Sequence, residues 1–411
     1  MSMDIRRGFA VVIVVGLVVR YALGILYTYP TDINYWMTVT ENIAAGESLY
    51  SLPGYYYTPV WGYFLALLTP FIQFSGIPLG EYAPEFVGSG QMAQDWNCVM
   101  PSIEFALVVK TFLFLADLAV MFLIYRVGCF MTTEKRSFVL ASIWFLCPFV
   151  ILISSVRVMF ENLEIMFMLL AFYALLTRHP AAAGVAMGLS LMVKPYGIFL
   201  GLLMIGYSYA QSGSARYTLS YVIATMLTGL AVMLPVFMEG DLSEALMWMS
   251  NKSPGQSTGS SYNLVVYIVP VLLLLTLFSS AAIAREGNDD PRRILTIALV
   301  LMALMLVVPG NIQYYMMLIP LALLVPMSYK NAIPFMFAVL SVFAFLSYND
   351  WSAALYIHYG FPGAGLLDSF SQFCSGLSQA VGYNPLKSLT AILCAVLPVV
   401  YLHRERCSNE A

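Results

Sequence analysis

One carboxylate, Asp32, follows the first apolar stretch of the chain, in the sequence TDINYW. An aspartate in this place can act as a general base if it faces a substrate hydroxyl. It also suits the N-cap position of a helix, because its side-chain oxygen accepts hydrogen bonds from the first free backbone N–H groups. The sequence alone leaves these two roles open.

Two cations interrupt apolar segments further along, Arg157 in SSVRVMFENLE and Lys194 in GLSLMVKPYGIF. Arg157, Glu161 and Glu164 follow the i, i+4, i+7 spacing, so we expect them on one helical face with an intrahelical Arg–Glu pair. The guanidinium of Arg157 also has the forked donors that suit a phosphate. Lys194 precedes a proline that ends its helix. Its ammonium either extends to water along its alkyl stem or needs an anionic partner, for which phosphate is a candidate.

The composition indicates which elements position these side chains. Of 411 residues, 60% are hydrophobic and only 10% are charged, with a mean hydropathy of +0.81. Soluble domains carry about a quarter charged residues, so a water-soluble globule and a disordered chain are both excluded. The net charge of −3 lacks the basic footprint of a nucleic-acid-binding protein. Apolar runs of helix length recur throughout, which predicts an all-α polytopic membrane protein.

We expect a single integral membrane domain over 1–411, with about twelve transmembrane helices. Arg6 and Arg7 precede the first of them, which is interpreted as an uncleaved span because its apolar core is too long for a signal peptide. The expected spans are 8–29, 103–126, 137–153, 159–177, 181–193, 196–210, 217–237, 263–284, 293–308, 314–328, 332–347 and 386–402. The cysteines show neither CxxC nor Cys/His spacing, so the sequence does not indicate a zinc or haem site.

The distribution of basic residues predicts the orientation. With both termini in the cytoplasm, most of the 19 Lys and Arg residues fall in cytoplasmic loops. This arrangement requires segment 59–75 to lie in the outer interface as an interfacial helix. The first extracytoplasmic loop, which carries Asp32, then covers 30–101, and a second long one covers 348–384.

Further polar groups fall inside the expected spans. Lys110 and Asp117 are seven residues apart in VVKTFLFLADLAV, and Arg20 lies midway along the first span. Ionisable groups at membrane depth often mark function, but ion partners within a bundle explain these equally well. The cluster from Tyr55 to Tyr57 suits either stacking on a sugar or anchoring in the interface.

A series of fragments, in order, resembles the GT-C polyprenyl-phosphate-sugar glycosyltransferases. The resemblance is greatest to the catalytic mannosyltransferases that add the first mannose of glycosylphosphatidylinositol, and it covers most of the chain. The fragments are TDINY with GESLY and YYYTP, KTFLFLADL followed by LIYR, VRVMFE, GLSLMVKPY, SYNLVVY and QYYMMLIP. Two positions depart from the family: its second motif aspartate is Asn34, and an arginine common before Thr-Pro is Tyr56. The first departure weakens a metal site, because a carboxylate pair has become one carboxylate and one amide.

The resemblance implies an inverting transfer of a sugar, with mannose expected, from a polyprenyl-phosphate carrier to a hydroxyl of a glycolipid or lipid-linked glycan. Asp32 would be the base, and Arg157 and Lys194 would bind the donor phosphate. The residues expected to contact substrate are Asn34, Tyr57, Glu161, Tyr196, Asn263, Gln313 and Tyr314. No metal ligands are assigned, and a divalent metal is not favoured. The resemblance leaves open whether this chain needs a small accessory subunit, as the eukaryotic enzyme does.

The site is expected on the extracytoplasmic face, in the plasma membrane of a prokaryote or the endoplasmic reticulum of a eukaryote, and the compact loops favour a prokaryotic relative. The same chemistry with another sugar, and an inactive subunit of the same fold, also stay open. The main alternative is a transporter or lipid-carrier flippase. Transporters usually show two similar halves with interrupted helices, whereas the loops here are lopsided and no repeat is visible.

Overall fold

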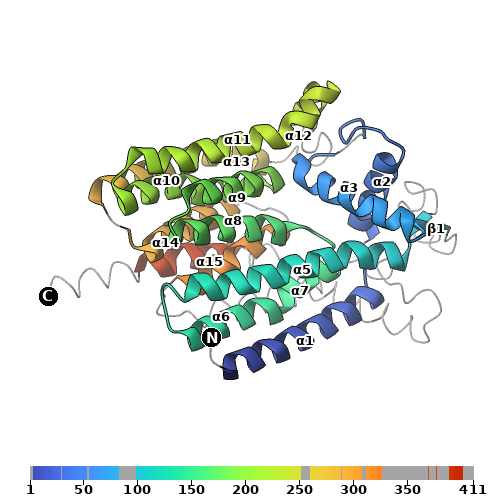
Figure 1. The fold of residues 1–411 in the computed structure, drawn as a ribbon, viewed down its shortest axis with the longest axis horizontal. Coiled ribbons are helices and arrows are strands. Elements are labelled where there is room, and N and C mark those ends of the chain that lie inside the picture. The colour runs from blue at the N-terminus through green and yellow to red at the C-terminus, as the bar shows by residue number, and fades with distance from the viewer. Residues whose placement is uncertain are drawn as a thin grey trace.

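Most of the long helices of the computed structural model lie alongside one another and run along the long axis of the molecule (Figure 1). Capping residues begin several of them. The hydroxyl of Ser102 accepts a hydrogen bond from the backbone N–H of Phe105 at 3.0 Å and so begins α5 (Ile103–Gly128). Prolines begin α7 (Pro148–Ser155) and α9 (Pro180–Val193), in the first turn, where the missing N–H leaves no helical bond unmade.

The structure describes residues 3–28, 30–52, 55–82, 99–250, 260–287, 289–307, 312–325 and 388–400, together with Ser369 and Gly376. The other helices within these ranges are α1 (Met3–Leu26), α2 (Pro30–Ala44), α3 (Pro59–Phe74), α6 (Glu134–Leu146), α8 (Glu161–Leu176), α10 (Ile198–Ser212), α11 (Ala215–Glu239), α12 (Leu242–Ser250), α13 (Ser260–Glu286), α14 (Pro291–Leu306) and α15 (Leu318–Leu324), with 3₁₀ turns η2 (Pro195–Gly197) and η3 (Ile312–Met317). The described strands β1 (Gly80–Tyr82) and β2 (Val99–Pro101) pair antiparallel, Gly80 opposite Pro101.

Four helices in the described residues are long and apolar enough to cross a membrane: α1, α5, α11 and the part of α13 from Ile268 to Glu286. Helices α6 and α7 form a fifth candidate, bent by 45° at the break between them. Pro148 explains the bend, because it cannot donate the N–H that would continue α6. The chain is therefore a largely helical protein with apolar helices that can span a membrane, as the composition predicts.

The remaining expected spans coincide with shorter elements. Segments 159–177, 181–193, 196–210, 293–308 and 314–328 correspond to α8, α9, α10, α14 and the η3–α15 pair, and 386–402 corresponds to a helix over Ser388–Val400. By length and composition, the described residues therefore contain four or five candidate spans, and the shorter apolar helices do not meet the same test. The span expected at 332–347 and the loop at 348–384 lie outside the described residues, apart from Ser369 and Gly376.

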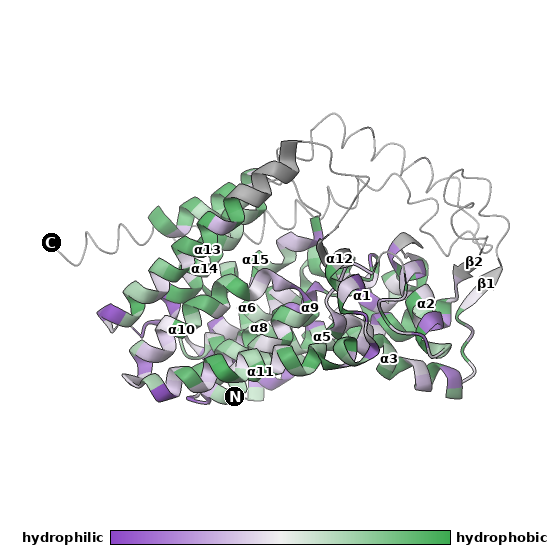
Figure 2. Cartoon of the chain, turned by 90° about the horizontal axis from the view of Figure 1, so that it is seen from above, coloured by the Kyte–Doolittle hydropathy of each residue, from purple (hydrophilic) through white to green (hydrophobic). Residues whose placement is uncertain are grey.

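Close packing holds the long helices together and leaves apolar surface outside. A Cβ at Gly184 of α9 would lie 2.3 Å from the carbonyl oxygen of Tyr221 in α11, so only glycine permits this approach. Coloured by hydropathy, the helices are apolar over most of their length, and polar segments gather toward their ends (Figure 2). At one end of the bundle lie α2, α3 and β1 (Figure 1).

The charges inside the expected spans have structural partners. Arg20 Nε donates to Asp117 Oδ2 at 3.0 Å, and Asn162 Nδ2 donates to Asp117 Oδ1 at 3.1 Å. Lys110 Nζ donates to the carbonyls of Gly24 at 2.7 Å and Tyr27 at 2.9 Å, at the C-terminal end of α1. A cation at a helix C-terminus satisfies free carbonyls and matches the helix dipole. These groups therefore tie α1, α5 and α8 together.

Candidate functional site

Asp32 occupies the first turn of α2, so it stands within the helix and not at its N-cap. Its Oδ2 is buried and has no hydrogen-bond partner among the described residues. Burial raises the pKa of Asp32 to about 6, and the nearby Glu161 carboxylate adds to this rise. The positive charges of Arg157 and Lys194 act in the opposite direction. Asp32 therefore shares a site with both expected phosphate-binding cations.

Lys194 lies where α9 ends and η2 begins, and its side chain is only 3% exposed. Its ammonium does not extend to water, because it pairs with Glu161 at the first residue of α8. The ammonium also lies 4.3 Å from the ring centre of Phe160, 5.5 Å from that of Tyr57 and 5.4 Å from that of Tyr314. Three aromatic faces and one carboxylate thus stabilise a buried positive charge.

Arg157 lies in the connection between α7 and α8, outside any helix. The expectation that Arg157, Glu161 and Glu164 share a helical face is wrong for Arg157, and Glu161 pairs with Lys194 instead. The physical reason is a backbone break at Val158, whose φ of 56° is left-handed and costly for a β-branched residue. Arg157 Nη1 instead donates to Gln313 Oε1 at 2.7 Å.

An indole from α2 holds this break in place. Trp36 Nε1 donates to the carbonyl of Val158 at 3.0 Å. Trp36 is one helical turn after Asp32, so the same helix carries the candidate base and supports the connection that carries Arg157. Trp36 was not expected at the site, although its i+4 spacing from Asp32 is visible in the sequence.

Glu164 is a second residue near Lys194 that the sequence did not predict at the site. It is fully buried in the first turn of α8. Its Oε1 accepts the backbone N–H of Gly197 at 2.7 Å, and its carbonyl accepts the hydroxyl of Ser190 at 3.0 Å. These bonds fix η2 and the end of α9 against α8, and so they fix Lys194 between them. The signal in the sequence is a second glutamate three residues after Glu161, in an apolar run.

Aromatic rings line the cluster. Trp61 of α3 stacks on Phe160 with ring centres 4.7 Å apart and planes 7° apart, and Tyr57 meets Phe160 edge to face at 5.1 Å. Burial, together with the charge of Asp32, raises the pKa of Tyr57, so its hydroxyl stays protonated at neutral pH. Tyr196 and Tyr314 pack with ring centres 4.8 Å apart.

Of the expected site residues, one points away from the cluster and another has a side chain that lies outside the described part of the structure. Asn34 is buried in α2, but two residues along a helix is a rotation of about 200°, so it points away from the face of Asp32. Asn263 lies in the first turn of α13, and its side chain falls outside the described part of the structure. Within that part, no group of three His, Cys, Asp or Glu residues could hold a metal ion.

No protein-family model, curated protein or solved structure matches this chain significantly. The chemistry of the site is therefore argued from its own geometry. An unpartnered carboxyl oxygen, two cations from separate elements and several aromatic faces meet where α2, α8, α9 and η3 come together. A carboxylate with a pKa near 6 can accept a proton, and two cations can hold a phosphate.

Proposed function

We propose that the protein is an inverting glycosyltransferase of the GT-C type, which transfers a sugar, expected to be mannose, from a polyprenyl-phosphate carrier to an acceptor hydroxyl. The observation that carries the proposal is the buried Oδ2 of Asp32, without a partner among the described residues, beside Arg157 and Lys194. A buried polar atom without a partner is costly, so its persistence indicates a group that is completed by a substrate.

The reaction assigns each charge a task. The acceptor oxygen attacks the anomeric carbon from the face opposite the phosphate, and the acceptor proton passes to Asp32. The bond between the anomeric carbon and the phosphate oxygen breaks, and the leaving polyprenyl phosphate keeps the electron pair. This leaving group needs no proton, so one base suffices. Arg157 and Lys194 stabilise the negative charge that grows on the phosphate.

The neighbouring groups fit a sugar and its carrier. Sugars stack on aromatic faces, and the half-buried rings of Tyr57 and Tyr314 beside Lys194 are candidates for such stacking, whereas Trp61 and Phe160 are buried against each other. Gln313 holds Arg157 through its amide oxygen, and the guanidinium of Arg157 has the forked donor geometry that suits a phosphate. In this proposal the chain crosses the membrane about twelve times with its termini in the cytoplasm, and the Asp32 cluster faces the extracytoplasmic side.

The test is sugar transfer from synthetic polyprenyl-phosphate-mannose by the purified protein, with a lipid extract as the source of acceptor. We expect Asp32→Asn to lower the turnover rate by about 10²–10⁴-fold, the usual contribution of a general base. The thermal unfolding temperature should not fall, because the amide replaces a carboxylate whose Oδ2 makes no hydrogen bond among the described residues. Asp4→Asn, the same change at an exposed residue of α1, is the matched control.

Four outcomes separate the hypotheses. Transfer that depends on Asp32 supports the glycosyltransferase, and mass spectrometry of the product then identifies the acceptor. Substantial transfer by Asp32→Asn rules out the assignment of the base. Binding of the carrier without transfer or hydrolysis favours the lipid-carrier flippase. Binding of a carrier with another sugar changes the proposed donor sugar but keeps the protein in the class of glycosyltransferases.

A further inference from the structure

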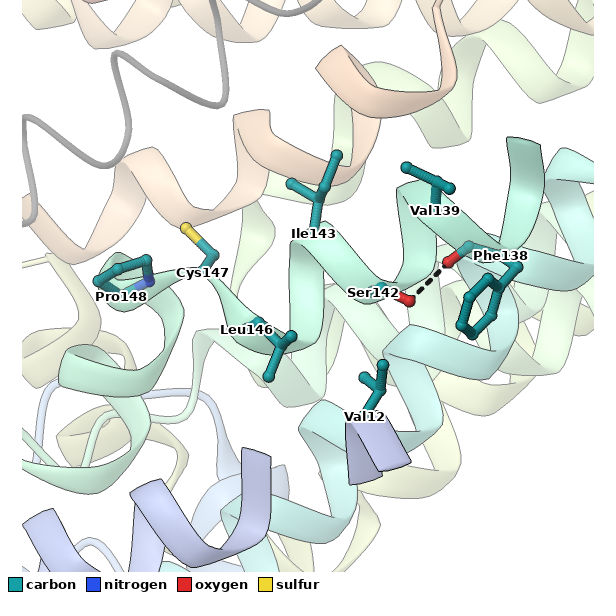
Figure 3. A pocket seen from close by; sticks show the side chains of 8 residues that line it. All are labelled: Val12, Phe138, Val139, Ser142, Ile143, Leu146, Cys147 and Pro148. Atoms are coloured by element: carbon teal, nitrogen blue, oxygen red, sulfur yellow. Dashed lines mark hydrogen bonds between the residues drawn. The ribbon is translucent and has the colours of Figure 1, made fainter. Parts of the chain in front are cut away.

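A groove lies on the side of the bundle between α1 and α6 (Figure 3), and none of its lining residues belongs to the Asp32 cluster. Its volume is about 440 Å³, within the range of about 300–1,000 Å³ that is usual for sites of small molecules. The lining side chains come from α1, α6 and the bend that follows α6, and they are Val12, Phe138, Val139, Ser142, Ile143, Leu146, Cys147 and Pro148.

Rigid packing frames the groove on the side of α1. A Cβ at Gly8 would lie 2.7 Å from Phe138 Cζ, and one at Gly16 would lie 2.4 Å from Phe145 Cε1. The two helices therefore touch at these glycines, with Val12 halfway between them. At the far end of α6, the 45° bend before α7 turns the chain away. The groove is thus built into the packing of the two helices.

The lining is apolar and open to the surroundings of the bundle. The hydroxyl of Ser142 donates to the carbonyl of Phe138 at 2.8 Å, within its own helix. Val139 is 51% exposed and Leu146 is 37% exposed. Because α1 and the α6–α7 pair are candidate membrane spans, the groove opens toward lipid chains and suits a hydrocarbon occupant.

Positive charge stands at one end of the groove. Lys135 and Arg136 are exposed in the first turn of α6, where they outnumber the one carboxylate of that turn, Glu134. Lys135 precedes Val139 and Ser142 by four and seven residues, and Arg136 precedes Ile143 by seven, so both lie on the helix face that lines the groove. The N-terminal end of α6 adds the partial positive charge of the helix dipole. The surface therefore pairs a cationic end with an apolar channel.

We propose that this groove binds an anionic glycerophospholipid, with one acyl chain along α6 and the phosphate of its head group against Lys135 and Arg136. A neutral zwitterionic lipid would fill the apolar part but gain less from the two cations. Basic residues at the end of a transmembrane helix are a common form of recognition for anionic head groups. The inference shares no residue with the proposed glycosyl transfer and stands without it.

The experiment measures lipid binding to the detergent-purified full chain by native mass spectrometry. Phosphatidylglycerol and phosphatidylcholine with identical acyl chains are the two probes. The double variant Lys135→Gln/Arg136→Gln removes the charge, and Val139→Trp fills the apolar part. Arg216→Gln is the matched control, because Arg216 is also exposed in the first turn of an apolar helix, α11, but does not line the groove.

We expect wild-type protein to bind phosphatidylglycerol about 25-fold more tightly than phosphatidylcholine, since each of the two cations near an anionic head group favours binding about fivefold. The double charge variant should lose this preference, Val139→Trp should weaken both lipids, and Arg216→Gln should change neither. Equal binding of the two lipids by wild type, or a preference that survives the loss of both charges, overturns the proposal. If the apolar segment 332–347 of this chain fills the groove instead of a lipid, the wild type should show no preference between the two lipids, which overturns the proposal.

Discussion

Two aspartates with buried carboxyl oxygens, Asp117 and Asp32, differ in how those oxygens are bonded. Each oxygen of Asp117 accepts a hydrogen bond, one from Arg20 and one from Asn162. Asp32 has a buried Oδ2 without a partner in the described part of the chain, while its neighbouring cations contact other groups. A carboxylate with both oxygens bonded fixes the packing of helices, whereas a carboxylate with one unbonded oxygen can accept a proton.

The two regions share one helix. In α8 the neighbouring residues Glu161 and Asn162 point to different clusters: Glu161 pairs with Lys194, and Asn162 donates to Asp117 and to the carbonyl of Leu113. The Asp117 network therefore anchors the beginning of the helix whose first turn supplies the site. The two clusters are therefore separated by a single residue along α8.

The largest effect is expected on the free energy of unfolding, at the buried ion pair of Arg20 and Asp117. Arg20→Met should reduce the free energy of unfolding by about 3–5 kcal/mol, because it leaves the buried Asp117 carboxylate without its cation. Arg20→Met combined with Asp117→Asn should recover most of this loss and also keep sugar-transfer activity. The measurements are denaturant unfolding in detergent and activity of the folded fraction. A double variant that is stable but inactive would place Asp117 in the chemistry.

The same design at the site should separate stability from activity. Lys194→Met should lower transfer by about 10²–10³-fold, the usual effect of removing one group that stabilises a transition-state charge. It should also destabilise the fold, because Glu161 then lacks its cation. Adding Glu161→Gln should restore the unfolding free energy without restoring transfer. Recovery of both properties together would show that this pair is purely structural, like Arg20 with Asp117.

Two tryptophans provide a smaller contrast with one substitution. Trp36→Phe removes the bond to Val158 and should cost about 1 kcal/mol of unfolding free energy. Trp61→Phe should cost less, because Trp61 Nε1 is buried without a partner among the described residues and Phe keeps a ring on Phe160. Differential scanning of both variants tests the difference. Equal destabilisation would mean that the bond to Val158 does not hold the connection.

The smallest expected effect is a shift in pH dependence. Burial raises the pKa of Asp32 to about 6, so kcat/KM should fall as the pH decreases through about 6, where the base becomes protonated. Arg157→Gln removes a positive charge that lowers this pKa, so its residual activity should fall at a higher pH. Arg126→Gln is the control, because Arg126 instead contacts Tyr173. An unchanged acidic limb in Arg157→Gln would separate Arg157 from Asp32.

Much of the helical layout follows from the sequence, because apolar runs of helix length can satisfy their backbone only as helices in a membrane. Segments 8–29, 103–126 and 217–237 correspond closely to α1, α5 and α11. The helical spacing did not predict the conformation from Arg157 to Glu161, since nothing in VRVMF indicates a valine with a left-handed backbone conformation. That conformation persists because Trp36, far away in the chain, holds its carbonyl.

The sequence by itself determined that this is a helical membrane protein and which charges are out of place in it, because the cost of ionisable groups among apolar residues is a property of composition and position. Only the tertiary structure decided which of those charges are satisfied. Both oxygens of Asp117 are bonded by residues of other helices, Arg20 and Asn162, whereas Asp32 lies near Arg157 and Lys194 and retains an oxygen without a partner in the described residues. Hydrogen-bond satisfaction depends on groups far apart in the chain, and no local pattern encodes it.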